Sequence, residues 1–129
     1  MATKNRIFTS FAIEDSTYRD FFIGQARNEK SPFLFVDMSV NEPWSEEWKR
    51  QCRTKIKGCD GMIALVSKNT AAAAGELWEV KCAKEEGVPV LGIYITTSNR
   101  PYSLPAEFAG VKVVDWTWPN IAAFINSLP

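Results

Sequence analysis

Glu79, with Glu76 three positions before it on the same predicted helical face, is the side chain of this sequence best suited to do chemistry. Both glutamates lie in residues 59–95, CDGMIALVSKNTAAAAGELWEVKCAKEEGVPVLGIYI, which predict a buried strand, a loop of small residues, a helix and a second buried strand. Glu79 then falls in the first turns of the helix, just beyond the carboxyl end of a strand, where open α/β sheets bind ligands. A carboxylate at that place suits chemistry at a sugar carbon, because it orients hydroxyl groups and stabilises developing positive charge.

Histidine is absent from the 129 residues. This absence excludes Ser-His-Asp and Cys-His catalysis and nearly all catalytic zinc sites. Chemistry therefore falls to carboxylates, hydroxyls, lysines and backbone amides, and we expect no metal site. Cys52, Cys59 and Cys82 lack CxxC spacing, so we expect them to be free thiols of a cytosolic protein.

The charge balance argues against nucleic acid and anionic membranes as partners, because 15 basic residues face 15 acidic ones. A hydrophobic content of 46% predicts a folded globular protein. The longest apolar runs, near 61–66 and 88–95, are strand-sized and too short to span a membrane. No secretion signal opens the chain, so we expect one cytoplasmic domain over residues 1–129.

Strand patterns alternate with helical patterns along the chain. Strands are expected at 6–11, 33–36, 61–66, 88–95 and 111–115, and helices beginning at Asp15 or Ser16, at Ser45, over 76–86 and at Pro119, with 96–110 as a long loop. The expected buried helix residues are Tyr18, Phe21, Phe22 and Ala26, then Trp48, Cys52 and Ile56, then Ile121, Phe124, Ile125 and Leu128. The alternation predicts an α/β, flavodoxin-like three-layer sandwich with a five-stranded parallel sheet in the order 2-1-3-4-5.

Three loops meet at the switch point of such a sheet, between its first and third strands: Ser10–Asp15, Asp37–Trp44 and Ser67–Gly75. None contains GxGxxG or GxxxxGK[ST], which disfavours Rossmann-type dinucleotide binding and P-loop phosphate chemistry. The first loop also lacks the clustered hydroxyls and glycine of a flavin-phosphate cradle. Ser67 stands where a response-regulator receiver would need an aspartate.

The segments RIFTSFAIEDS, CDGMIALVSKNT and LWEV followed by GVPVLGIYI together resemble a TIR-like domain, in particular the bacterial TIR-like sensing subunits of the antiphage systems called Thoeris. Catalytically active TIR domains cleave NAD with a glutamate on the helix after the third strand, and Glu79 matches that position. The resemblance implies NAD as substrate, with no cofactor. It also implies a linear or cyclic ADP-ribose product, self-association through TIR surfaces and a separate effector protein that responds to the product.

Glu79 is therefore the candidate catalytic residue. The candidate substrate-binding residues are Ser10, Phe11, Ala12, Asp37, Trp44, Ser67 and Glu76. Two departures from the family pattern stand out. Gly75 replaces the usual tryptophan four positions before the glutamate, and Ala71–Ala74 lacks the usual serine.

Simpler interpretations of the same residues stay open. The alternative for Glu79 is a solvated glutamate near a helix N-terminus, for Glu76 a surface residue, and for Asp15 a helix cap. Trp44 suits core packing or self-association as well as stacking on a base.

Two other functions also remain open. One is a non-catalytic TIR adaptor that acts by self-assembly. The other is an enzyme similar to nucleoside deoxyribosyltransferases, whose helix glutamate attacks a deoxynucleoside and forms a covalent intermediate.

Overall fold

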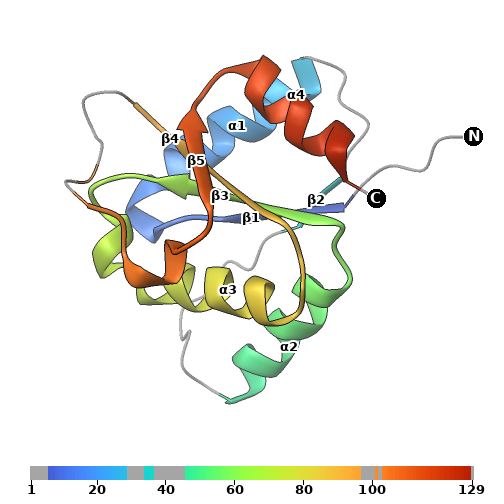
Figure 1. Cartoon of the computed structure of the whole chain (residues 1–129), viewed down its shortest axis with the longest axis vertical. Coiled ribbons are helices and arrows are strands. Elements are labelled where there is room, and N and C mark those ends of the chain that lie inside the picture. Colours follow the sequence, from blue (N-terminus) through green and yellow to red (C-terminus); the bar gives the residue numbers. More distant parts are fainter. Residues whose placement is uncertain (1–5, 29–33, 37–45, 97–100, 102, 129) are drawn as a thin grey trace, which may run out of the picture.

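A parallel sheet forms the centre of the protein, whose computed structural model describes residues 6–28, 34–36, 46–96, 101 and 103–128. The sheet order is β2-β1-β3-β4-β5, and every neighbouring pair is parallel (Figure 1). The strands are β1 (Arg6–Ser10), β2 (Leu34–Val36), β3 (Gly61–Val66), β4 (Val90–Tyr94) and β5 (Lys112–Asp115). The helices are α1 (Ser16–Asn28), α2 (Glu46–Lys57), α3 (Ala74–Glu85) and α4 (Trp118–Ser127), with short 3-10 turns η1 (Ile13–Asp15), η2 (Thr70–Ala72) and η3 (Ala106–Phe108). The expected α/β class with a parallel sheet is confirmed.

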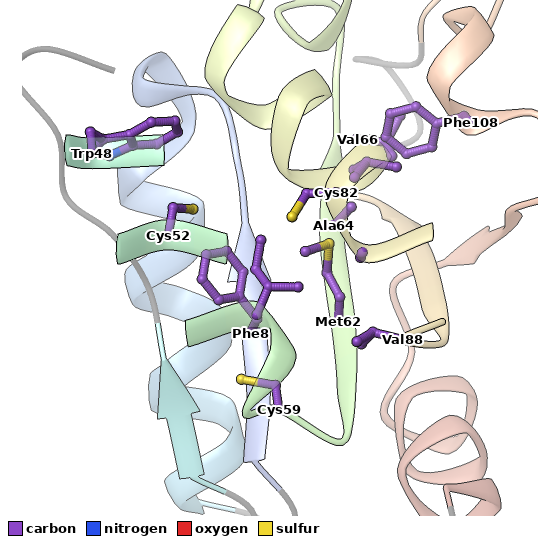
Figure 2. Packing of buried hydrophobic residues seen from close by; sticks show 13 residues of the cluster. Phe8, Trp48, Cys52, Cys59, Met62, Ala64, Val66, Cys82, Val88 and Phe108 are labelled. Atoms are coloured by element: carbon purple, nitrogen blue, oxygen red, sulfur yellow. The ribbon is translucent and has the colours of Figure 1, made fainter. Parts of the chain in front are cut away.

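Helices cover both faces of the sheet, with α1 and α4 on one side and α2 and α3 on the other (Figure 1). The strand β3 is buried along its whole length, and its side chains alternate between the two sides. Ile63 and Leu65 pack with α1 and α4, whereas Met62, Ala64 and Val66 pack with α2 and α3. Figure 2 shows the second of these clusters, where Trp48 and Cys52 of α2 face the sheet.

The same alternation places one polar side chain under α3. Ile7 of β1 packs on the α1 and α4 side, and Phe8 packs on the α2 and α3 side. Ser10 lies two residues after Phe8, so it points to the same side as Phe8. Because Ser10 is also the last residue of β1, its hydroxyl reaches the carboxyl edge of the sheet beneath α3.

Several element ends differ from the expectations. The third helix begins at Ala74 rather than Glu76, because alanine is a strong helix former and extends the helix backwards. The last helix begins at Trp118, where the Thr117 hydroxyl accepts a 3.3 Å hydrogen bond from the Asn120 backbone N–H. The segment 96–110 contains η3, which buries Phe108.

The expected helix faces pack on the sheet, where Tyr18, Phe124 and Leu128 are only partly buried, and one expected residue is exposed. Phe22 and Ala26 are buried on α1, but Phe21 is 61% exposed, so its expected burial was wrong. Neighbouring helical positions point about 100° apart, and only one of two consecutive aromatics can face the sheet. Ser45, expected to cap α2, lies outside the described residues. In the described part of the chain, no helix has the length and apolar content needed to cross a bilayer.

Candidate functional site

The side of helix α3 that faces the sheet carries a mixed stripe, in which two acidic side chains are followed by apolar ones. Four of its five buried residues, Glu76, Glu79, Val80 and Ala83, follow the spacing i, i+3, i+4, i+7 of one helical face, and Cys82 is the fifth. The two glutamates occupy the first turns, above the carboxyl edge of the strands, and the apolar residues follow over the hydrophobic core. The positive end of the helix dipole also favours acidic residues in the first turn.

Hydrogen-bond donors on β1 and α2 hold the Glu79 side chain between these two elements. The Ser10 hydroxyl donates a 2.7 Å hydrogen bond to Glu79 Oε1, and the Cys52 thiol donates to Glu79 Oε2 at 3.6 Å. Glu79 is only 5% exposed. Because both of its oxygens accept hydrogen bonds, the side chain is arranged as a carboxylate, and the interpretation of a solvated glutamate is wrong.

Cys52 remains a thiol, and therefore a donor, at neutral pH. Burial raises its pKa well above the ordinary value, and the nearby Glu79 carboxylate raises it further. The sequence placed Cys52 on the buried stripe of its helix, between Trp48 and Ile56, and that packing role is confirmed. Its contact with Glu79 was not anticipated, because periodicity identifies a buried face but not the partner that the face meets.

Asp15 forms a second polar contact at the same edge of the sheet. It is 1% exposed, and its carboxylate accepts a 2.5 Å hydrogen bond from the Ser67 hydroxyl and a 2.9 Å bond from the Asn69 side-chain amide. The Ser67 oxygen in turn accepts the Asn69 backbone N–H at 2.9 Å. Asp15 thus joins η1 to the turn after β3, and the expectation that its side chain caps a helix is replaced by this tertiary role.

Glu76 completes the acidic cluster, which we define as Asp15, Glu76 and Glu79. Glu76 is 2% exposed, so the expectation of a surface residue was wrong. Neither of its carboxyl oxygens accepts a hydrogen bond from the residues that the structure describes. Burial raises the pKa of Glu76 well above its ordinary value; the Thr70 hydroxyl opposes this effect, and the charges of Glu79 and Asp15 add to it.

The remaining predicted residues differ in how they lie. Phe11 is half-buried, and the Arg19 guanidinium stacks 5.0 Å from its ring centre. Ala12 is buried, and its carbonyl oxygen accepts the Asp15 backbone N–H at 2.8 Å. Asp37 and Trp44 lie outside the described residues.

Trp78, which precedes Glu79 on α3, packs against α2. Its ring packs against Trp48 of α2 at 5.3 Å between ring centres, with the Arg53 guanidinium 5.7 Å from the Trp78 ring centre. It therefore joins α2 to α3 on a face other than the stripe that carries Glu79.

Asn69 and Thr70 are contributors that the sequence did not single out. The Thr70 hydroxyl oxygen accepts the Ser67 backbone N–H at 3.0 Å and orders the turn after β3. An Asn-Thr pair after a strand is a common turn signal, so its position was readable from the sequence but its target Asp15 was not. The three cysteines are free thiols, as expected, and all three are buried. In the part of the chain covered by the structure, no group of three or more acidic or cysteine side chains is arranged to hold a metal ion.

The fold and the site together define an α/β protein with an acidic cluster at the switch point between β1 and β3. The sequence model of the family described as Thoeris protein ThsB, TIR-like domain, matches residues 8–100. This match covers most of the chain, so the protein belongs to that TIR-like family.

Solved structures of two other proteins are similar to this chain. A 3-dehydroquinate dehydratase-like protein from Bifidobacterium longum is similar with a TM-score of 0.52 and 9% identity, over 98% of this chain and 95% of that one. A cysteine desulfurase from Thermococcus onnurineus NA1 is similar with a TM-score of 0.48 and 16% identity, over 76% of this chain and 24% of that one. No curated protein matches the sequence. At 9% identity, the likeness to the Bifidobacterium longum protein concerns the fold alone.

Proposed function

We propose that the protein cleaves the bond between nicotinamide and ribose in NAD, with Glu79 as the catalytic residue. The product is a linear or cyclic ADP-ribose signal, read by a separate effector protein in the cytoplasm of a phage-infected bacterium. The family match supports a role among the antiphage TIR proteins. The observation that carries the chemistry is the oriented Glu79 carboxylate at the switch point of the sheet.

The reaction suits a carboxylate without a histidine or a metal. When the bond from ribose C1′ to the nicotinamide nitrogen breaks, its electron pair goes to nicotinamide, which leaves as a neutral molecule. Glu79 orients ribose hydroxyls and stabilises the positive charge that develops at C1′. Attack by water gives ADP-ribose, attack by another hydroxyl of the same molecule gives a cyclic product, and in either case Glu79 accepts the proton that the attacking group loses.

Ser10 and Cys52 occupy the carboxylate oxygens that a ribose would need. Glu79 is only 5% exposed, so a nucleotide reaches it only after neighbouring groups move aside. Ribose hydroxyls then replace the donors, which exchanges one set of hydrogen bonds for another at small net cost. This arrangement suits an enzyme that rests closed and acts after a trigger.

The test is product analysis by liquid chromatography and mass spectrometry after concentrated protein is incubated with NAD. Glu79→Gln keeps the size of the side chain and removes its charge, and the exposed residue Glu14 of η1 supplies the control Glu14→Gln. We expect nicotinamide release from the native protein and from Glu14→Gln, and a loss of roughly a hundredfold or more in Glu79→Gln. ADP-ribose indicates hydrolysis, and ADP-ribose less one water indicates cyclisation.

The same assay is repeated in lysate of phage-infected cells that express the protein, because an infection trigger is absent from purified protein. Nicotinamide release that persists in Glu79→Gln contradicts the catalytic assignment. No release in either setting favours the adaptor. Cleavage of deoxynucleosides in place of NAD indicates the deoxyribosyltransferase chemistry instead.

A second candidate is a self-assembling interaction module. Ile13 of η1 is 65% exposed and Phe21 of α1 is 61% exposed. Large exposed apolar side chains are common at protein contacts, and Ile13 lies two residues before Asp15 of the acidic cluster. Sedimentation of the native protein and of Ile13→Lys and Phe21→Lys tests whether two copies associate here. A monomer at all concentrations contradicts this candidate.

A further inference from the structure

Glu76 differs from the other two carboxyls of the acidic cluster in its hydrogen bonds. Asp15 accepts from Ser67 and Asn69, and Glu79 accepts from Ser10 and Cys52. Both oxygens of Glu76 are fully buried, and neither meets the geometry of a hydrogen bond with the described residues, although the Thr70 hydroxyl lies near enough to lower the Glu76 pKa. Buried polar groups of folded proteins are nearly always paired, so such an unpaired group calls for an explanation.

The groups that surround Glu76 favour its neutral form. Asp15 faces it from η1, Glu79 from its own helix and Thr70 from η2. Two of these three neighbours are carboxylates that repel a third negative charge, and burial removes the water that would solvate it. A neutral carboxyl group carries one O–H donor and one carbonyl acceptor, and here neither has a partner among the described residues.

Glu76 and Glu79 are coupled by their positions on α3. They lie three residues apart on the stripe that faces the sheet, one turn from each other. A ligand that contacts Glu79 therefore lies about one helical turn, roughly 5.4 Å, from Glu76. The two side chains offer opposite hydrogen-bonding character, because Glu79 only accepts whereas neutral Glu76 also donates.

We propose that Glu76 is a second ligand-binding residue of this site, which donates the O–H of its carboxyl group to a ribose oxygen while Glu79 accepts from the ribose hydroxyls. A vicinal diol presents both donors and acceptors, so this pair of side chains is complementary to it. The inference rests on the proposed function, because it takes a ribose as the group that enters. It assigns to Glu76 the binding and orientation of the sugar, and leaves charge stabilisation to Glu79.

Two variants of Glu76 separate ligand binding from packing. Glu76→Gln keeps the size, the neutral state and a donor, whereas Glu76→Met keeps the size and removes every donor and acceptor. The ligand is an NAD analogue with a carbon in place of the ring oxygen of the nicotinamide ribose, which binds but is not cleaved. Calorimetry gives its Kd, steady-state kinetics give kcat and KM for NAD, and thermal unfolding reports the fold.

We expect Glu76→Gln to bind the analogue within about threefold of the native protein and Glu76→Met to bind it at least about tenfold more weakly, since a lost hydrogen bond leaves a ligand group unpaired. The KM for NAD follows the same order, and Glu76→Met stays folded. Native-like binding by Glu76→Met overturns the inference. Equal weakening in both variants overturns it as well, because an ionised carboxylate would then be the binding form.

The outcomes also distinguish this inference from the proposed function. If the native protein cleaves NAD, Glu79→Gln does not, and Glu76→Met behaves as native, the inference alone fails. If the analogue binds with the expected order of affinities but NAD is never cleaved, the proposed activity fails and Glu76 keeps its role as a ligand-binding residue. If the native protein neither binds the analogue nor cleaves NAD, both as purified protein and in lysate of phage-infected cells, both fail.

Discussion

The Ser10 hydroxyl donates a 2.7 Å hydrogen bond to Oε1 of Glu79, and the bond joins residues 69 positions apart in the sequence. Both groups are buried, and each belongs to a different layer of the fold, Ser10 to the sheet and Glu79 to the helix above it. A charge-assisted bond in such surroundings contributes about 1.5–3 kcal/mol. The contact that orients the candidate catalytic group is thus also one that secures α3 to β1.

Ser10 and Thr9 provide a matched pair of buried hydroxyls. Ser10→Ala removes a donor from the Glu79 carboxylate and is expected to lower the free energy of unfolding by about 1.5–3 kcal/mol. Thr9→Val removes a hydroxyl oxygen for which the described residues supply no hydrogen bond, so it is expected to be neutral or stabilising. Urea unfolding of both variants makes the comparison. Equal losses of unfolding free energy in the two variants would show that the Ser10 hydrogen bond does not stabilise the fold.

The thiol of Cys52 is expected to orient Glu79. Cys52→Val removes the donor at nearly constant volume and should reduce kcat roughly two- to fivefold, the effect of one weak hydrogen bond. Cys52→Ser keeps a donor and should stay nearer to native activity. The control is Cys59→Ser, because the Cys59 thiol donates to the Lys55 carbonyl oxygen at 3.2 Å and not to Glu79. If Cys52→Val and Cys59→Ser give the same kcat, the thiol has no orienting role.

Glu76 gives the stability of the protein a pH dependence of defined sign. Its folded pKa lies well above the ordinary 4.5, so the folded state binds the proton more tightly than the unfolded state. This tighter proton binding adds to the free energy of unfolding in full below pH 4.5. The added stability is lost as the pH rises toward the folded pKa, by up to about 1.4 kcal/mol per pH unit. The measurement is urea unfolding at several pH values for the native protein and for Glu76→Gln, which should lack this loss.

Glu14→Gln, at an exposed residue, serves as the control for this comparison of unfolding free energies at several pH values. Native and Glu76→Gln curves that stay parallel above pH 4.5 would mean that Glu76 titrates alike in both states. Glu76→Met tests the related cost of burial, and we expect it to raise the free energy of unfolding by about 1–3 kcal/mol, because it replaces an unpaired buried polar group with an apolar one.

The three thiols are expected to resist alkylation in the folded protein. Burial raises the pKa of Cys59 and of Cys82 from 9.0 to about 11, so at pH 8 each carries about a hundredfold less thiolate than in the unfolded chain. Mass spectrometry after iodoacetamide treatment should show no adduct on the native protein and three in urea. A single thiol that reacts in the native state at the unfolded rate would contradict its burial.

The strands were readable from the sequence because each depends on its own local pattern. Gly61–Val66 is continuously apolar, and it forms β3 with both faces covered. The burial of Glu76 was missed because no local sequence pattern indicates it. Periodicity counts apolar side chains, and a glutamate on the buried stripe of α3 looks identical in sequence to one in solvent.

The partners of the site residues depend on tertiary geometry. Ser67, Asn69 and Asp15 meet across η1 and the turn after β3, which no spacing rule predicts. The family resemblance pointed to Glu79, and the structure adds the hydrogen-bond donors on β1 and α2 that hold it.

The mixed stripe on α3 fixes the register of this helix along the sheet. A slide of one turn, about 5.4 Å, would carry Glu79 to the level now held by Ala83, inside the apolar cluster and away from its donors. A slide in the other direction would bring Val80 among the carboxyls. Either step buries an unpaired charge or breaks the apolar packing, and so costs several kcal/mol. The helix α3 is therefore held at one position along the sheet. A nucleotide must enter the site by displacing the elements around α3, not by sliding the helix.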